Sequence, residues 1–373
     1  MKVKLGDLTK IKTGKLDANA SSPNGIYPFF TCSKEPLQIS TYSYDCECVL
    51  VAGNGDLNVK YYNGKFDAYQ RTYIIEDNGS NQLYMPYLYY FMEGYVEELR
   101  KLSIGGVIKY IKLGNLTEAL IELPKIEDQR AIVDILNKSK RILSYHQQQL
   151  QKLDELVKAR FVELFGDPIN NPKGLPVKSL KELSTLITNG NTPKGGNENY
   201  VDNGILFLRS QNVWRNRIEL DDVAYIDETT HRSLKKSSLK HKDILITKTG
   251  RINTENSSLG RAALYLGADD SANINGHVYL VRLDGSVVPE YVVTILTSEA
   301  YRKYIRKVCV GGIDKRQINL DQVEDFPIIL PSVELQERFA AFVEQINKSK
   351  AAIQKSLNEA QLLFDSLMQQ YFG

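Results

Sequence analysis

Few residues in this sequence carry the chemistry of an enzyme. The 373 residues include four cysteines and four histidines. The cysteines form no CxxC pair and the histidines show no metal-binding spacing, so we expect neither a disulfide framework nor a zinc site. There is also no Walker lysine motif, no HExxH, no GxSxG and no Asn-Pro-Pro-aromatic tetrad of the kind that amino-methylating enzymes use. The sequence therefore predicts no catalytic residue and no bound metal.

Long hydrophobic runs are missing as well. No stretch approaches the roughly 20 apolar residues that a membrane-spanning helix needs. The N-terminal sequence MKVKLGDLTK is too polar for a signal peptide. We therefore expect a cytoplasmic protein that does not bind membranes.

Neither sign of charge is in large excess, because the formal net charge is +2. Basic residues nevertheless gather locally, at 231–242, 301–307 and 314–317. Such clusters are usually solvated surface, and the alternative is that they contact phosphates.

The glycine-rich stretch GNGDLN at 53–58 superficially resembles a nucleotide-binding loop. A phosphate-binding loop of that kind must lead into a helix, whose N-terminus holds the anion. The residues that follow, VKYYNGKF, are typical of a turn and a strand instead. The stretch is thus predicted to be part of a hairpin.

One long segment of the chain is present twice. LPKIEDQRAIV begins at Leu123 and LPSVELQERFA begins at Leu330, an offset of 330 − 123 = 207 residues. The same offset carries Gln129 onto Gln336, and the end of FVELFG at Gly166 onto the end of MQQYFG at Gly373. Each copy begins with Leu-Pro and ends with Phe-Gly. Proline is tolerated at the beginning of a helix, and glycine is common directly after its end.

Apolar residues recur every seven positions within each copy. The first copy has Leu136, Leu143, Leu150, Val157 and Leu164; the second has Val343, Lys350, Leu357, Phe364 and Tyr371, and a second seam of Phe339, Ile346, Ile353, Ala360 and Leu367. This spacing predicts two helices of about 35 residues, on the order of 50 Å long, each lying along another helix. The simplest arrangement pairs them with each other in antiparallel orientation, because the globular segments before them would otherwise collide. Lys350 interrupts the seam, and His146 is expected to be a partly exposed seam residue.

The segments before the two helices are also distantly similar. CVLVAGNG at 48–55 resembles DILITKTG at 243–250, and IGGVIKYI at 104–111 resembles VGGIDKRQI at 310–318. Short β-branched runs such as 72–77 and 278–283 predict strands, and 85–102 and 288–308 predict helices. The fold class is therefore α+β, with two tandem mixed α/β domains, each followed by a long helix, and pseudo-twofold symmetry. The predicted boundaries are 1–124 and 177–331 for the domains, 125–166 and 332–373 for the helices, and 167–176 for the linker.

Aromatic, amide and basic residues decorate loops in both halves. The candidates for contacts with DNA are Lys60, Tyr61, Tyr62, Lys65, Gln70 and Arg71 in the first half, and Arg209, Gln211, Asn212, Arg215, Arg217, Lys248, Arg251, Lys315 and Arg316 in the second. Arginine suits guanine edges, glutamine and asparagine suit adenine edges, and lysine and tyrosine commonly hold phosphates. The alternative is that Tyr61, Tyr62 and Trp214 are core or interface residues.

Taken together, these motifs resemble the specificity subunit of type I restriction-modification enzymes over the whole chain. The resemblance rests on the helix entries LPKIEDQR and LPSVELQER, the exits FVELFGD and LMQQYFG, and stretches such as FFTCSKEP, YYNGKFDAYQRTY and LKHKDILITKTG. It implies two target-recognition domains that each read one half of an interrupted DNA target, and helices that space the half-sites. It also implies two methyltransferase subunits and restriction subunits as partners, which would hold S-adenosylmethionine, ATP and magnesium. The chain itself would be non-catalytic and hold no cofactor.

Two other functions remain open at the level of sequence. One is a stand-alone DNA methyltransferase or nuclease, although the cofactor and metal motifs are missing. The other is a coiled-coil adaptor that binds only proteins.

Overall fold

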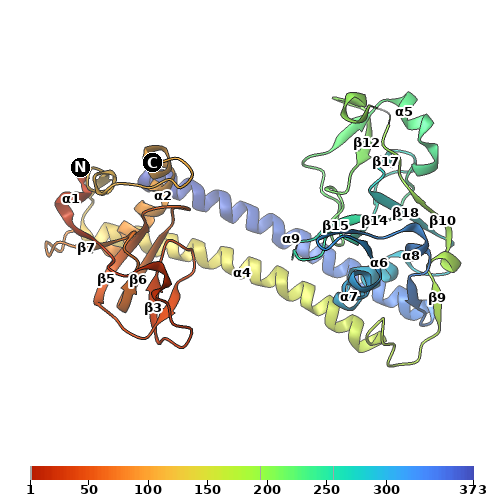
Figure 1. The fold of residues 1–373 in the computed structure, drawn as a ribbon, viewed down its shortest axis with the longest axis horizontal. Coiled ribbons are helices and arrows are strands. Elements are labelled where there is room, and N and C mark those ends of the chain that lie inside the picture. Colours follow the sequence, from red (N-terminus) through yellow and green to blue (C-terminus); the bar gives the residue numbers. More distant parts are fainter. Residues whose placement is uncertain (1, 194, 255) are drawn as a thin grey trace. The chain divides into compact units, whose positions relative to one another are not determined.

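The computed structural model describes residues 2–193, 195–254 and 256–373, which form two compact units. Unit 1 comprises Met1–Gln149 and Ile353–Gly373, and unit 2 comprises Leu150–Ala352. Two 40-residue helices, α4 (Ile126–Phe165) and α9 (Val333–Phe372), each contribute to both units (Figure 1). The predicted α+β class is confirmed, and the helices are longer than the predicted 35 residues.

Unit 1 is built on a six-stranded sheet with the strand order β2-β7-β5-β6-β3-β4. These strands are β2 (Thr9–Thr13), β3 (Tyr27–Phe30), β4 (Leu37–Ile39), β5 (Tyr44–Ala52), β6 (Val59–Ala68) and β7 (Thr72–Asp77). The remaining elements are the pair β1 (Lys2–Lys4) and β8 (Leu120–Glu122), and the helices α1 (Leu5–Leu8), α2 (Met85–Leu102) and α3 (Leu113–Thr117). The strand predicted at 72–77 and the helix predicted at 85–102 are confirmed.

The glycine-rich stretch at 53–58 joins two antiparallel strands. Strands β5 and β6 pair from Tyr44 and Phe66 to Val51 and Val59, so the chain turns back at this stretch and continues as a strand. No helix follows to hold a phosphate. The predicted hairpin is therefore confirmed.

Unit 2 contains two four-stranded sheets, one three-stranded sheet and one strand pair, with the orders β10-β18-β14-β16, β11-β13-β12-β17, β15-β20-β19 and β21-β9. The strands are β9 (Val177–Ser179), β10 (Ser184–Asn189), β11 (Tyr200–Val201), β12 (Ile205–Leu208), β13 (Ala224–Ile226), β14 (Ile244–Thr247), β15 (Thr249–Arg251), β16 (Ala262–Leu264), β17 (Ala272–Ile274), β18 (Val278–Leu283), β19 (Val310–Gly311), β20 (Lys315–Gln317) and β21 (Pro327–Ile329). Helices α5 (Glu228–Ser233) and α8 (Leu320–Glu324) are short. The strand predicted at 278–283 is confirmed.

The single helix predicted at 288–308 is wrong, because the chain forms two helices there. Helix α6 spans Pro289–Thr297 and helix α7 spans Glu299–Val308. Ser298 between them has an extended backbone, and its side chain accepts a hydrogen bond from the backbone N–H of Tyr301. Serine at this position caps the second helix, which is a local signal that the apolar periodicity concealed.

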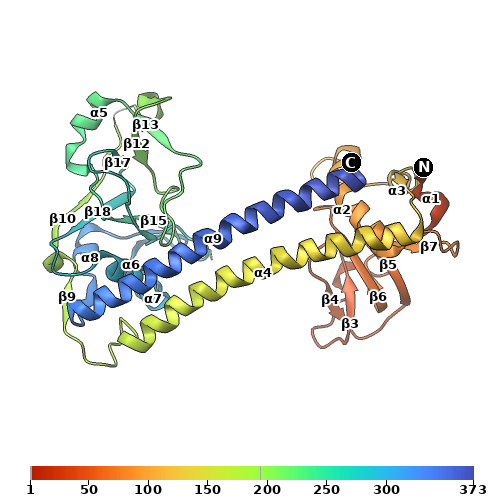
Figure 2. The same cartoon turned by 180° about the vertical axis from the view of Figure 1, so that it is seen from behind.

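Segments of α4 and α9 pack together within each unit, and the two helices lie side by side in both ribbon views (Figure 2). In unit 1, Phe364 and Phe372 near the end of α9 pack in the same apolar cluster as Val133 and Leu136 near the beginning of α4. In unit 2 the Phe161 ring, near the end of α4, lies 5.6 Å from that of Phe339, near the beginning of α9. The helices thus run antiparallel within each unit, as predicted.

The residues of both predicted seams of α9 are buried or half-buried. Taken together, they follow one another at alternating intervals of four and three residues along the helix. Phe339 and Ile346 are buried, and Ile353, Leu357 and the seam positions after them are half-buried. This alternation is typical of helix pairs that pack side chains into one another.

Lys350 occupies a half-buried seam position without disturbing the helix. Its Nζ lies 2.6 Å from Oδ1 of Asp154 on α4. We expect Lys350→Leu to raise the free energy of unfolding by about 1 kcal/mol, because a partly exposed ion pair contributes little and an apolar side chain there is removed from water. Thermal unfolding would measure this, with Lys348→Leu at an exposed position as the control. A lower stability than wild type would contradict the seam assignment.

The repeated glutamine of each long helix is a buried structural residue. Gln129 is fully buried; its Oε1 accepts the Tyr84 N–H at 2.8 Å, and its Nε2 donates to the carbonyls of Gln82 at 2.8 Å and Pro124 at 2.9 Å. Gln336 repeats the arrangement in unit 2. Each glutamine therefore joins the beginning of a long helix to the loop that enters the domain helix α2 or α6.

Candidate nucleic-acid interface

Four of the predicted residues of the second half meet on the three-stranded sheet β15-β20-β19. Arg251 on β15 lies opposite Lys315 on β20, and Arg316 is the next residue of that strand. Lys248 lies directly before β15, with its Nζ 5.8 Å from the ring centre of Tyr279.

Segments that are more than 60 residues apart in the sequence (315 − 251 = 64) thus bring four basic residues to one small sheet. Arg251 and Lys315 lie opposite each other and are exposed, whereas Arg316 alternates to the other face of the sheet and, like Lys248, is half-buried. We call this set the β15-β20 cluster: Lys248, Arg251, Lys315 and Arg316.

Only part of the charge in this cluster is neutralised by the contacts that the structure describes. Arg251 Nε lies 3.4 Å from Asp314 Oδ2, with the arginine side chain 71% exposed. Arg316 Nε donates to the carbonyl of Gly312 at 3.1 Å, a bond that leaves its positive charge uncompensated. The cluster is therefore suited to an anionic ligand.

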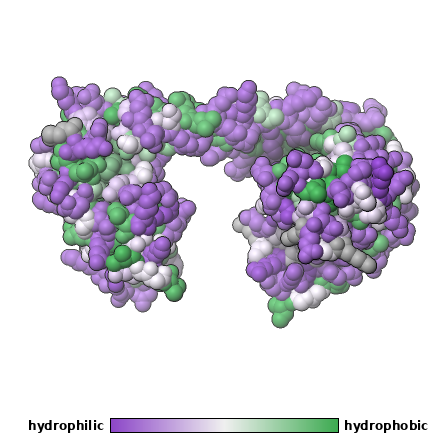
Figure 3. Space-filling view, turned by 90° about the horizontal axis from the view of Figure 1, so that it is seen from above, coloured by the Kyte–Doolittle hydropathy of each residue, from purple (hydrophilic) through white to green (hydrophobic). Residues whose placement is uncertain are grey.

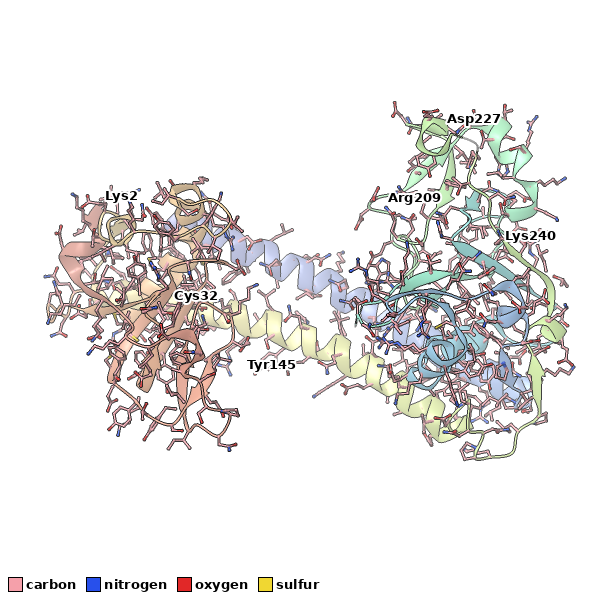
Figure 4. All side chains as sticks on the ribbon, in the orientation of Figure 1. Lys2, Cys32, Tyr145, Arg209, Asp227 and Lys240 are labelled. Atoms are coloured by element: carbon pink, nitrogen blue, oxygen red, sulfur yellow. The ribbon has the colours of Figure 1, made fainter. Side chains whose placement is uncertain are left out.

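The loop after β12 holds five further candidates. Arg209, labelled in Figure 4, directs its Nη2 to Asp222 Oδ1 at 2.9 Å, and Gln211 donates to the same carboxylate. Asn212 is 2% exposed, and its amide donates to the carbonyls of Glu219 and Asp222. Asn212 therefore shapes the loop from inside, whereas Gln211 is exposed at its surface.

Trp214 and its neighbours form a cationic stack. The Arg261 guanidinium lies 3.8 Å from the centre of the Trp214 ring, and that of Arg217 lies 5.2 Å from it. Arg217 also pairs with Glu219 at 2.7 Å, and Arg215 is exposed. Trp214 is half-buried, in keeping with the alternative that it is a packing residue.

Arg261 is a residue that the sequence analysis missed. It is 7% exposed, and its Nε donates to the carbonyl of Ser257 at 3.0 Å. Burial lowers the pKa of its guanidinium, and the charge of Arg215 lowers it further. By stacking on Trp214, Arg261 connects the loop after β12 to segment 251–261, which continues from β15. No local motif marks it, because the ring it contacts is distant in the sequence.

The candidates on strand β6 of unit 1 do not share one surface. Successive strand residues face opposite sides of a sheet. The Tyr62 ring packs 5.1 Å from that of Phe30, whereas the Tyr61 hydroxyl donates to Glu47 Oε1 at 2.7 Å. Burial is the main reason that the pKa of the Tyr61 hydroxyl is raised. The expected row of contacts is thus divided between two faces.

The remaining unit 1 candidates surround this strand. Lys60 is half-buried beside Asn58, and burial lowers the pKa of its amine. The Lys65 Nζ lies 4.5 Å from the ring centre of Tyr42, and its hydrogen bond to that tyrosine raises the pKa of the lysine. Gln70 donates to Asp17 at 2.9 Å, and Arg71 is exposed.

The described residues offer neither a metal site nor a membrane-spanning helix. Within the described ranges, no group of three or more histidine, cysteine, aspartate or glutamate side chains could hold a metal ion. Of the helices in the same part of the chain, none is long and apolar enough to span a membrane. Hydrophilic side chains cover most of the face seen in Figure 3, with small apolar patches between them.

Comparison with known proteins relates the chain to one family. Residues 1–155 match the family described as "Type I restriction modification DNA specificity domain". The EcoDI specificity subunit of Escherichia coli is 37% identical over 156 residues, which are 42% of this chain and 34% of that protein. The StySPI specificity subunit of Salmonella potsdam is 24% identical over 288 residues, 74% of this chain and 60% of that protein. The chain thus spans between about a third and three fifths of the length of these relatives.

The fold is also similar to that of a solved specificity subunit. The crystal structure of the type I restriction-modification S subunit from M. genitalium aligns with all of this chain and 96% of that one, with a TM-score of 0.64 and 15% sequence identity. At that identity the likeness concerns the fold alone. The sequence matches thus relate residues 1–155 of this chain to type I restriction-modification specificity subunits, and the solved structure shows a similar fold over the whole chain.

Proposed function

We propose that the chain is the non-catalytic DNA-recognition subunit of a type I restriction-modification complex. The observation that carries the proposal is the β15-β20 cluster of basic residues in unit 2. It is supported by the match of residues 1–155 to a DNA specificity domain. Each half of the chain would read one half of an interrupted target.

The residue types divide into two roles. The basic side chains Lys248, Arg251, Lys315 and Arg316 would contact phosphates, which fix the position of a protein on the duplex. Exposed amide and guanidinium groups, such as those of Gln211 and Arg215, would reach base edges and read sequence. The exposed candidates for phosphate and base contacts in unit 1 are Lys65, Gln70 and Arg71.

The partners follow from the same proposal. Two methyltransferase subunits and the restriction subunits would assemble with the chain and hold S-adenosylmethionine, ATP and magnesium. The chain would then contribute specificity, and the reactions would take place on its partners. A stand-alone methyltransferase remains the alternative enzyme, and methyl transfer by the purified chain alone would support it.

Selection from a randomised duplex library tests the proposal. The tagged chain, isolated with its native partners, is expected to enrich two short fixed blocks separated by an unspecified gap of constant length. Binding should weaken steeply as salt rises, because lysine and arginine contacts to phosphates release counterions. No enrichment at low salt with the partners present would reject DNA recognition and favour the protein adaptor.

A further inference from the structure

Two exposed apolar side chains lie at equivalent tips of the two halves. Val107 and Ile313 are separated by 313 − 107 = 206 residues, and each follows a Gly-Gly pair and precedes a lysine two residues later. Their exposed fractions are 104% and 90%, the highest among the large exposed hydrophobic residues that the structure describes. A single exposed apolar side chain is common on protein surfaces and needs no ligand. What distinguishes these two is that they recur at matching positions of the duplicated sequence, at the cost of unfavourable contact with water.

Both tips belong to narrow hairpins with a defined backbone. In unit 1, Ile104 and Tyr110 exchange backbone hydrogen bonds of 3.0 and 2.8 Å. In unit 2, the N–H of Gly312 donates to the carbonyl of Lys315 at 3.2 Å. Gly105 has φ +116° and Gly311 has φ +131°, values that favour glycine. The tips are therefore held in shape by the chain itself.

Each hairpin is anchored on an equivalent segment of its own unit. The N–H of Gly55 donates to the carbonyl of Lys109 at 3.0 Å in unit 1. The N–H of Ile252, next to Arg251, donates to the carbonyl of Asp314 at 2.9 Å in unit 2. The unit 2 tip consequently projects from the β15-β20 cluster.

The charges beside the tips indicate the kind of ligand. Lys109 in unit 1 and Lys315 in unit 2 are both exposed, and Arg316 is half-buried behind the second tip. The acidic neighbour in unit 2, Asp314, pairs with Arg251.

Beside Val107 and Ile313, the exposed apolar side chains of the two hairpins are Ile104, Ile108 and Tyr110 in unit 1, which are 42%, 63% and 39% exposed, and Val310 in unit 2, which is 39% exposed. The apolar area of so narrow a hairpin is small beside the roughly 800 Å² that each partner buries in a standard protein interface. Such a tip fits a DNA duplex, where proteins insert single apolar residues between base steps and hold the flanking phosphates with basic residues.

We propose that Val107 and Ile313 are apolar wedges that enter the minor groove, one in each half of the DNA target, and partly unstack a base step there. This inference rests on the proposed function and names residues within it that deform DNA rather than read base edges. Lys109 in one half-site and Lys315 in the other would each hold a phosphate beside the opened step.

The test places 2-aminopurine, a base whose fluorescence rises on unstacking, at successive steps of the selected target. The full chain with its native partners is compared with Val107→Ser and Ile313→Ser. Wild type is expected to raise the fluorescence at one step in each half-site. Each variant should abolish the rise in one half-site only and raise Kd roughly tenfold or more, because the buried apolar contact is lost. The salt dependence of binding should stay unchanged, since no charge is removed.

Three controls separate the possible causes. Leu120→Ser and Leu266→Ser change other exposed leucines, 53% and 66% exposed, and should leave Kd and fluorescence unaltered. Lys315→Gln should keep the fluorescence rise while reducing the salt slope by about one.

The inference is overturned if Val107→Ser and Ile313→Ser behave like the leucine controls. A second outcome also overturns the inference: the variants no longer assemble with their partner subunits, yet they bind and unstack DNA as wild type does. The tips would then be contacts to partner proteins. A wild-type complex that binds no duplex would instead reject the proposed function itself, so the two failures are distinguishable.

Discussion

Replacing Gln129 by leucine is expected to lower the free energy of unfolding of the chain by roughly 3 to 5 kcal/mol. The side chain is fully buried and holds one backbone N–H and two backbone carbonyls. Leucine has a similar size and no polar atom, so all three backbone groups would lose the side chain that holds them, and any group that stays shielded from water would be left without a partner. Each such group costs about 1 to 3 kcal/mol.

The second copy of this residue provides an internal comparison. Gln336 is 1% exposed and holds the N–H of Val288 and the carbonyl of Pro331. With two described bonds in place of three, Gln336→Leu should cost roughly 2 to 4 kcal/mol. Denaturant unfolding followed by circular dichroism measures both effects.

Gln147→Leu is the matched control, because this glutamine is exposed on the same helix as Gln129. We expect its stability to stay within about 0.5 kcal/mol of wild type. If Gln129→Leu were as stable as this control, the repeated glutamine would have no structural role, and its recurrence would need another explanation.

Adding one heptad to each long helix is expected to lengthen the gap between the two half-sites by up to about three base pairs. Seven residues extend a helix by about 10 Å, and one base pair rises about 3.4 Å. Suitable duplications are residues 144–150 in α4 and 354–360 in α9, because contacts such as Lys350 with Asp154 and Lys140 with Phe364 bring these stretches opposite each other. The seven-residue period keeps the same side chains on the seam.

Library selection with the lengthened chain reads out the result directly. The two fixed blocks should keep their sequences, because no recognition loop changes, while the gap between them grows. A four-residue insertion in α4 alone is the control, since it turns the apolar seam away from α9 and should lower stability. An unchanged gap after the double duplication would show that the helices do not set the spacing.

Much of the fold could be predicted because its signals are local and periodic. Heptad spacing indicated both long helices, and β-branched runs indicated β7 and β18. The break at Ser298 was missed because apolar periodicity continues across it, while the serine cap that divides α6 from α7 is a single residue.

The site was less predictable, because it depends on which segments meet. Sequence reasoning gave Tyr61 and Tyr62 a common role, yet alternation along β6 turns them to opposite faces. It placed Asn212 at a surface, whereas the loop buries its amide. It also overlooked Arg261, whose partner Trp214 comes from another loop.

The sequence by itself determined the duplication, the α+β class, the paired helices and the family resemblance, since each follows from residues at fixed spacing along the chain. The tertiary structure alone decided that Lys248, Arg251, Lys315 and Arg316 form one cluster, and that Val107 and Ile313 lie at equivalent exposed tips. The physical reason is that strand pairing joins residues distant in the chain, as it does for Arg251 and Lys315. Side-chain burial depends on those pairings, so no local pattern encodes it.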